Sequence, residues 1–380
     1  MKAPSPVWMD KFLNWSFAIS FLVIIFLPFL SEQFNLRTAK SLTENRRLTE
    51  RPSFKMDSLS FFPLKYEKYY NDNFSFRNFF VQLNSRFSAK TYGISAIPDI
   101  LIGKEGWLYY VAKSQGNSLE DYKGLVSVDR RTLELIRENL EQRTRTLKSQ
   151  GIQFVVIVAP DKQTIYPEYL PESTKRPRRY PTRLDQIVEY LKKHSTAQIL
   201  DVRKELLKEK EKGRLPLYKK TDSHWNNFGG FIAYQQILRS LSMEPKLASD
   251  FEWKQANQGR GDLANMLALD ERITEENQIL FTTSFENEIS FQEKENNYGT
   301  SLKKKSLIAT NKDKALPKLL VFQDSFGEAL LKFLSYHFRE SVFIQSDSYS
   351  SAIIEKESPD VVIFEIVERY APFLADGELK

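Results

Sequence analysis

The sequence contains no cysteine among its 380 residues and only three histidines, His194, His224 and His337. The absence of cysteine excludes a disulfide framework, a thiolate metal site and a cysteine nucleophile. With so few histidines, a zinc site would also lack ligands at a metal-like spacing. We therefore expect neither a metal nor a cofactor. What is present is an ample supply of core residues, because 41% of the chain is hydrophobic and 28 residues are Phe.

The charge of the chain is positive but has no local concentration. The formal net charge is +6 and the pI is about 9.0. This balance permits an acidic partner such as a polyanionic glycan or an anionic lipid. Because the charge is spread along the chain rather than gathered in a basic arm, we expect no nucleic-acid partner.

One long apolar run is found near the start of the chain. Residues 12–30 read FLNWSFAISFLVIIFLPFL, and Lys2 and Lys11 precede them. About 19 residues of helix span roughly 28 Å, close to the thickness of a bilayer core. The segment ends without the small residues of a signal-peptide cleavage site, which favours an uncleaved anchor over a signal peptide. The flanking lysines predict a cytoplasmic tail at 1–11 and an extracytoplasmic body. A buried core helix is the alternative.

After this segment the chain divides into an aromatic-rich section and a strand–helix alternation. We predict a membrane-proximal cap at 31–125 and a catalytic domain at 126–380, with a polar, irregular insertion at 242–316 that carries its own small strands. Helices are expected at 131–150, 183–191 and 228–241, and buried strands at 152–160, 197–202, 319–323 and 360–367. This alternation predicts an α/β fold with a mostly parallel sheet.

A serine follows one of the buried strands directly. LLVFQ leads into Asp324-Ser325-Phe326-Gly327, and a helical pattern follows. In an open α/β sheet, ligands bind at the carboxyl ends of the strands, where helix N-termini can stabilise an oxyanion. Ser325 is thus a candidate nucleophile. On position alone, Asp324 or Ser325 could equally be a simple helix cap.

The stretch TDSHW at 221–225 holds an acid and a histidine two positions apart. In an extended loop these two side chains point the same way. Asp222 could then hold Nδ1 of His224 and leave Nε2 as a base for a serine. The alternative is a surface turn whose histidine caps a backbone group.

Seven motifs in this chain resemble those of the SGNH-hydrolase-like family of alginate O-acetylation proteins, the AlgX/AlgJ type. In chain order they are ENRRLTERP (44–52), GKEGWLYY (103–110), PDKQTIYPEYLP (160–171), TDSHWNNFG (221–229), GDLANML (261–267), QDSFG (323–327) and PDVVIFEIVERY (359–370). They occur in the family's order and cover most of residues 44–370.

This resemblance implies a three-layer α/β/α SGNH-hydrolase-like domain with a permuted strand order. By position, it implies that Ser325 is the nucleophile, that Asp222 and His224 are its partners, and that Lys162 and Tyr166 lie at the rim of the site. It also implies acetylation of the hydroxyls of an exported polysaccharide. A membrane-bound O-acyltransferase would then be the acetyl donor.

Two positions depart from the family's motifs. Gln323 stands where the family usually has a glycine that lets the chain turn tightly under the nucleophile, and Ser223 replaces a commoner threonine. The motifs suggest no side-chain oxyanion donor, so the backbone amide of Ser325 is the one we expect.

Two further features could contact a sugar. The basic loop KRPRRYPTR at 175–183 includes Arg178 and Arg179, which could grip an anionic glycan or lie solvated on the surface. Trp107 could stack on a sugar ring or pack in the core.

The expected function is therefore that of a membrane-anchored O-acetyltransferase. Two alternatives remain at this point: a carbohydrate esterase with the same acyl-serine, and a non-catalytic, anchored glycan-binding protein.

Overall fold

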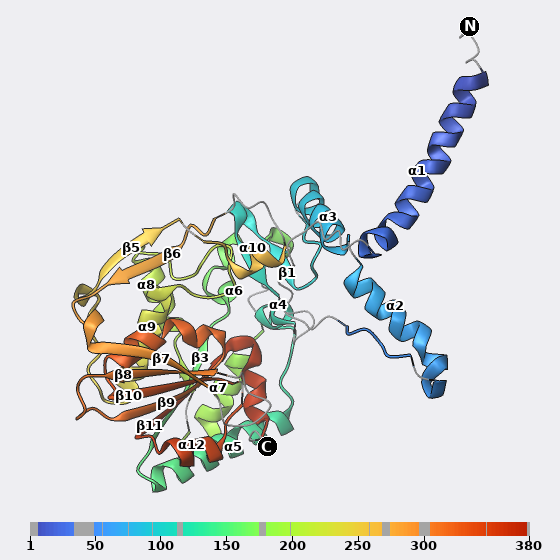
Figure 1. The fold of residues 1–380 in the computed structure, drawn as a ribbon. Coiled ribbons are helices and arrows are strands. Elements are labelled where there is room, and N and C mark those ends of the chain that lie inside the picture. The colour runs from blue at the N-terminus through green and yellow to red at the C-terminus, as the bar shows by residue number, and fades with distance from the viewer. Residues whose placement is uncertain are drawn as a thin grey trace. The chain divides into compact units, whose positions relative to one another are not determined.

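The computed structural model divides the chain into two compact units, residues 1–97 with 265–270, and residues 98–264 with 271–380 (Figure 1). The structure describes residues 7–33, 49–54, 56–74, 76–92, 94–111, 117–174, 180–197, 199–257, 259–267, 274–295, 305–346 and 348–377. The functional boundary that the sequence predicts at 125/126 stays a prediction.

The first unit is helical. It contains α1 (Val7–Gln33), a short 3-10 turn (Met56–Phe61), α2 (Phe62–Asn73) and α3 (Arg77–Tyr92). Over the residues described, no helix has both the length and the hydropathy needed to cross a membrane. The predicted segment 12–30 falls within α1, but its side chains at 13, 28 and 29, like residues 1–6 of the predicted tail, lie outside the described residues.

The second unit is built on a seven-stranded mixed sheet with the order β4-β3-β11-β9-β10-β8-β7. The first five strands in this order pair in parallel, while β8 runs antiparallel to β10 and β7 antiparallel to β8. The strands are β3 (Gln153–Ala159), β4 (Ile199–Asp201), β7 (Ile289–Glu295), β8 (Lys305–Asn311), β9 (Lys318–Gln323), β10 (Glu340–Gln345) and β11 (Val361–Val367). The α/β fold with a mostly parallel sheet is confirmed.

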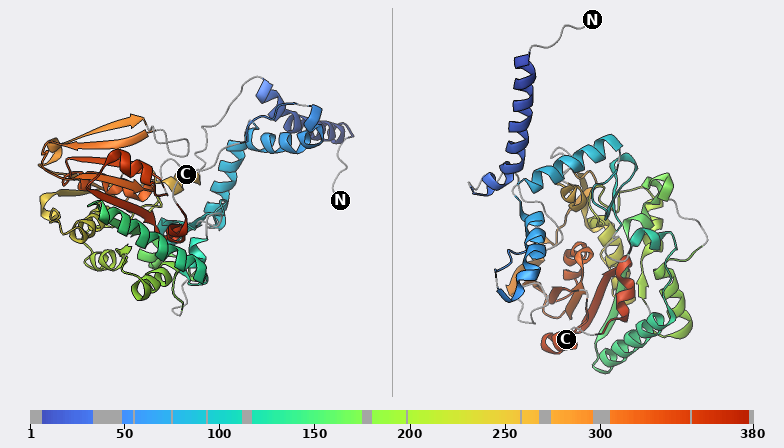
Figure 2. Two further views of the ribbon diagram at one scale, coloured as in Figure 1. Left: turned by 90° about the horizontal axis from the view of Figure 1, so that it is seen from below. Right: turned by 90° about the vertical axis from the view of Figure 1, so that its right-hand side faces the viewer.

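Helices cover both faces of this sheet (Figures 1 and 2). Alternate residues of the central strands point to opposite faces, so that Val321 joins one buried cluster and Phe322 the other. One face packs against α6 (Lys162–Ile165), α8 (Arg203–Glu211), α9 (Asn227–Ser240) and α11 (Leu331–Ser335), and the other against α5 (Arg130–Ser149), α7 (Arg183–His194) and α12 (Ser351–Glu357). This is a three-layer α/β/α arrangement.

Local sequence signals explain where the predicted helices begin and end. Asp129 caps α5 by accepting from the Thr132 amide, and Gly151, at φ 76°, follows its end. Thr182 and Asp185 form a capping box at the start of α7. Asn226 caps α9 by accepting from two amides of its first turn. The predicted helices and strands are each found within a few residues of the expected bounds, and of the strands β4 is only half-buried.

The region predicted as an insertion contributes to two different sheets. β5 (Glu252–Ala256) and β6 (Gln278–Thr282) form a small antiparallel pair, as expected of an insertion. By contrast, β7 and β8 extend the main sheet. The sequence did not predict that β7 and β8 join the main sheet. β7 reads ISFQEKE, the polar composition of an edge strand. The remaining short elements are β1 (Ile100–Ile102), β2 (Leu108–Tyr110), α4 (Ser118–Tyr122) and α10 (Asp262–Met266).

The central strand β11 carries a fully buried acid, Glu365. Its Oε2 accepts from the Asp324 amide at 3.2 Å, while Oε1 has no hydrogen-bond partner within the described part of the chain. Burial, with the nearby Asp324 carboxylate, raises the pKa of Glu365 well above its usual range. The raised pKa favours the neutral form of Glu365 in the folded protein.

A neutral Glu365 makes the effect of Glu365→Gln depend on pH. Above about pH 4.5, the ordinary value for this group, the unfolded chain releases the proton while the folded chain keeps it. This group therefore lowers the free energy of unfolding as pH rises, with a slope of up to roughly 1.4 kcal/mol per pH unit. The glutamine variant, which has no such proton, should gain stability relative to the parent between pH 5 and 8, measured by urea unfolding.

Glu189→Gln, on the exposed side of α7, is the matched control. Its carboxylate is ionised in both states above pH 6, so its stability difference from the parent should stay flat. A flat difference for Glu365→Gln as well would show that Glu365 is ionised in the folded protein.

Candidate active site

The carboxyl ends of β3, β9 and β11 lie along one edge of the sheet because these strands are parallel neighbours. Asp161 lies just beyond β3, Ser325 just beyond β9 and Arg369 just beyond β11. Open α/β sheets place their ligands at this edge. The position expected of a nucleophile from the sequence is therefore the one that Ser325 occupies, and its side chain is partly exposed.

The turn that carries Ser325 is held by the carboxylate of Asp324. One oxygen accepts from the Phe326 amide at 2.8 Å and caps a 3-10 helix over Ser325–Ala329. The other accepts from the Val367 amide at 2.7 Å and so ties the turn to the end of β11. Asp324 is thus the helix cap, and its capping bond fixes the backbone on either side of the serine.

The loop carrying His224 is a narrow hairpin-like turn. An antiparallel bridge between Tyr218 and Trp225 closes it. The Trp225 indole Nε1 then donates to the carbonyl of Phe326 at 2.8 Å, between residues 101 positions apart. This bond joins the histidine loop to the nucleophile turn. It brings His224, which precedes Trp225, next to Ser325, which precedes Phe326.

Asp222, His224 and Ser325 form a continuous hydrogen-bonded chain. The Ser325 Oγ lies 2.7 Å from Nε2 of His224, and Nδ1 of His224 lies 2.7 Å from Oδ1 of Asp222. With the proton on Nδ1, the ring donates to Asp222 and presents a lone pair on Nε2 to the serine hydroxyl. This is the geometry that general-base activation of a serine needs.

The electrostatics of Asp222 suit this arrangement. Burial by itself would raise the pKa of Asp222, but the hydrogen bond and charge of the His224 ring, together with Lys219, outweigh burial and lower the pKa below its usual range. Lys219 Nζ lies 3.7 Å from Oδ2. Asp222 is therefore ionised, and it can stabilise the imidazolium that forms when His224 takes a proton.

Gln323, the departure from the family motif, leaves the serine geometry intact. Its backbone does not have a positive φ, so no glycine is needed at this position. The close approach occurs instead at Gly327, where a Cβ would come within 2.5 Å of the Gln323 side chain. The 5% exposed Gln323 side chain packs against that glycine beneath the turn.

Three of the five residues expected near a bound sugar have extensive contacts within the protein. Lys162 is 2% exposed and donates to the carbonyls of Leu108 and Lys220 at 2.6 and 3.2 Å. Burial lowers its pKa to about 8. Trp107 stacks on Tyr166 with ring centroids 4.7 Å apart, and the two rings are 5% and 7% exposed. In this structure all three pack the domain, and contact with a sugar would require them to become exposed.

Two further residues were predicted to contact a sugar, and the structure describes neither of them. Arg178 and Arg179 lie outside the described residues. Arg369 pairs with buried Asp161, which follows β3. Glu368 accepts from the Asp161 amide at 2.9 Å and from Thr164 Oγ1 at 2.7 Å. These contacts cross-link two strand ends beside the nucleophile turn.

Three residues around the histidine loop were not identified as functional from sequence. Glu275, 2% exposed, accepts from the amides of Lys220 and Thr221 and from the Thr221 hydroxyl. Asp262 lies 3.7 Å from His224 Nδ1, and Gly261 approaches the Thr221 backbone so closely that a Cβ would clash. The motif GDLANML contained Gly261 and Asp262. A local sequence pattern, however, does not predict which residue 40 positions away a side chain will contact.

Asp222, His224 and Asp262 offer three ligand atoms within 4.8 Å of one another. The donor set does not suit a cation, however, because Nδ1 already faces Asp222 Oδ1 at hydrogen-bond distance. A metal at Nδ1 would displace the proton that this bond requires. We therefore interpret the cluster as part of the hydrogen-bonded chain.

The chain is similar to known proteins over most of its length. The chain is 26% identical over 309 residues to a probable alginate O-acetylase AlgJ of Pseudomonas putida, a match that covers 73% of this chain and 72% of that one. It is 23% identical over 329 residues to the corresponding protein of Azotobacter vinelandii, covering 82% and 80%. Among solved structures, Bacillus cereus PatB1 matches with a TM-score of 0.52 and 18% identity, over 71% of this chain and 96% of that chain. This structural likeness supports the fold.

A family model matches a larger continuous part of the chain than any single motif does. It describes the SGNH hydrolase-like domain of the acetyltransferase AlgX and matches residues 100–348, well over half of the chain. That range contains the whole Asp222–His224–Ser325 chain of hydrogen bonds. The protein thus belongs to the SGNH hydrolase-like acetyltransferase family.

Proposed function

We propose that this protein is a polysaccharide O-acetyltransferase that carries the acetyl group as an ester on Ser325. The observation that carries the proposal is the pair of 2.7 Å contacts linking Asp222, His224 and Ser325. The curated relatives are called probable alginate O-acetylases. We therefore propose alginate or a similar exported polysaccharide as the acceptor.

The first half of the reaction loads the serine. His224 Nε2 takes the hydroxyl proton while Ser325 Oγ attacks the carbonyl carbon of the acetyl donor. The first amides of a helix have no intrahelical partner, so the Ser325 amide, at the start of the 3-10 turn, is available to the oxyanion. When the tetrahedral intermediate collapses, the donor's leaving group departs with the proton from His224.

The second half transfers the acetyl group. A sugar hydroxyl gives its proton to His224 Nε2 and attacks the acyl-serine. Collapse of the second tetrahedral intermediate releases the acetylated sugar and returns the proton to Ser325. Asp222 remains ionised in both halves and stabilises the positively charged ring. Esterase activity would use the same steps with water as the attacking group.

Substitution of each of the three hydrogen-bonded residues should lower acyl-enzyme formation, but to different degrees. Ser325→Ala should abolish labelling by an activated acetyl ester, and His224→Ala should lower turnover by about 10⁶-fold, because the serine loses its base. Asp222→Ala should cost less, about 10⁴-fold, because it only orients the ring and stabilises its charge. Intact-protein mass spectrometry measures the label. Ser149→Ala, in α5, is the control and should label normally. Labelling of Ser325→Ala would place the nucleophile elsewhere.

Transfer rather than hydrolysis requires a bound sugar to react faster than about 55 M water, which positioned reactants can do, because effective molarities reach about 10⁵ M or more. We expect residues 31–380 to acetylate uronate oligosaccharides from an activated ester and to turn over faster when sugar is added. Mass spectrometry of the sugars tests this. Unmodified sugars, with acetate released at the same rate with and without them, would favour an esterase.

We also propose a single-pass anchor at residues 12–30 that holds the catalytic domain outside the cytoplasm, near a membrane-bound O-acyltransferase that supplies acetyl groups. The apolar run and the lysines before it support this orientation. A reporter that is active only outside the cytoplasm, fused after Lys380, should therefore give a signal. A signal from a cytoplasm-specific reporter at the same position would contradict the proposed orientation.

A further inference from the structure

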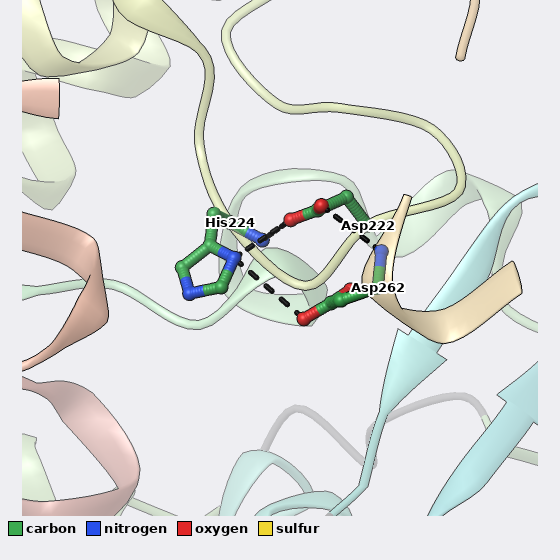
Figure 3. Close-up of side chains that lie close together, drawn as sticks. All are labelled: Asp222, His224 and Asp262. Atoms are coloured by element: carbon green, nitrogen blue, oxygen red, sulfur yellow. Dashed lines mark hydrogen bonds and ion pairs between the residues drawn. The ribbon is translucent and has the colours of Figure 1, made fainter. Parts of the chain in front are cut away.

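A second carboxylate lies beside the histidine of the site. Asp262 Oδ2 is 3.7 Å from Nδ1 of His224, on the same ring edge that Asp222 Oδ1 contacts at 2.7 Å. Figure 3 shows both acids directed at this nitrogen, from two segments of the chain. At 3.7 Å Asp262 makes no hydrogen bond to the ring, so any effect on His224 must be electrostatic or must act through another group.

Ser223 is that other group. Its hydroxyl lies 2.5 Å from Asp262 Oδ2 and 3.2 Å from Nδ1 of His224. A carboxylate oxygen accepts hydrogen bonds and donates none, so the proton of the Ser223 hydroxyl points toward Asp262 Oδ2. The lone pairs of Ser223 Oγ are then free to face the Nδ1 proton of His224. Through this bond, Asp262 determines that Ser223 accepts from the ring instead of donating to it.

Asp262 is itself held rigidly on the loop that it braces. Its Oδ1 accepts from the amides of Ser223 and Leu263 at 2.7 and 2.6 Å. Its own amide donates to Asp222 Oδ2 at 3.1 Å. One residue therefore fixes the Ser223 backbone, the Ser223 hydroxyl and the second oxygen of Asp222. Gly261 permits this, since a Cβ there would lie 2.1 Å from the Thr221 carbonyl.

From these contacts we propose that Asp262, acting through Ser223, is a second positioning carboxylate for His224. Two groups then act on Nδ1, and we call them the two arms of the site. Asp222 contacts Nδ1 directly, and Asp262 acts on it through the Ser223 hydroxyl. Both arms favour the tautomer with the proton on Nδ1, which leaves Nε2 free to accept the Ser325 proton. The catalytic consequence rests on the proposed acyl-transfer function, whereas the effect on the ring does not.

Asp262→Asn is the informative change. The charge is lost, and an amide NH₂ in place of Oδ2 would donate to Ser223 Oγ, which turns the hydroxyl proton toward Nδ1. Loss of a charged hydrogen bond of this kind should lower kcat roughly tenfold to a hundredfold. KM should be unchanged, because Asp262 faces Nδ1 of His224, whereas the reacting Ser325 hydroxyl faces Nε2. Ser223→Ala should have a similar effect, and the double variant should be no worse than either single variant, because both changes break the same arm.

Nuclear magnetic resonance of the ring separates this proposal from the proposed function. The chain has only three histidines, so the His224 signals can be assigned with His224→Gln. In Asp262→Asn the Nδ1 proton signal should weaken, because Ser223 no longer accepts from the ring while Asp222 still does. Glu276→Gln, which breaks an ion pair with Lys220, is the matched control and should leave the Nδ1 signal unchanged.

Two results would overturn the proposal. In one, the Nδ1 proton signal of His224 is the same in Asp262→Asn as in the parent. In the other, the effects of Asp262→Asn and Ser223→Ala on kcat simply multiply in the double variant. If the parent protein transfers no acetyl group while the ring signals respond as expected, the proposed function fails and the positioning role of Asp262 stands.

Discussion

The active-site geometry depends on how the end of β9 is joined to the end of β11. The two strands pair in parallel from Val361↔Leu319 to Phe364↔Phe322, and the Asp324 carboxylate continues the connection by accepting from the Val367 amide. The same carboxylate caps the turn after it. Because the serine follows Asp324 directly, its direction is set by the sheet itself. The histidine loop is then brought to this fixed point by the Trp225 indole.

Charged groups are concentrated where the strands end, although burial of charge is costly there. Arg369 and Asp161 are both nearly excluded from solvent and pair with one another. Burial raises the pKa of Glu368 to about 7, although Arg203 and two hydrogen-bond donors favour its ionised form. Buried pairs of this kind contribute little net stability compared with apolar residues of the same size. They do restrict how the ends of β3 and β11 can be arranged, which a site made from strand ends requires.

Much of the fold could be read from local patterns, and the failures have a physical cause. β3 and β11 are rich in branched apolar residues, which suit a strand covered on both faces. α5 and α7 carry apolar stripes, and a capping residue precedes each of them. β7 carried no such signal, because an edge strand that is exposed to water has polar residues on its outer positions. Whether such a segment joins a sheet depends on a neighbour that the segment itself does not contain.

The sequence by itself determined which groups could react. It contains one Asp-x-His segment and, at Ser325, a serine two positions after a buried strand. The two-residue spacing of Asp222 and His224 already suits a carboxylate that holds a ring. Only the tertiary structure decided that His224 meets Ser325 across 101 residues, that Asp262 joins them, and that Lys162, Tyr166 and Trp107 are buried. Spacing along a chain controls the directions of near neighbours, whereas burial and contact between distant segments arise only when the sheet and its helices pack together.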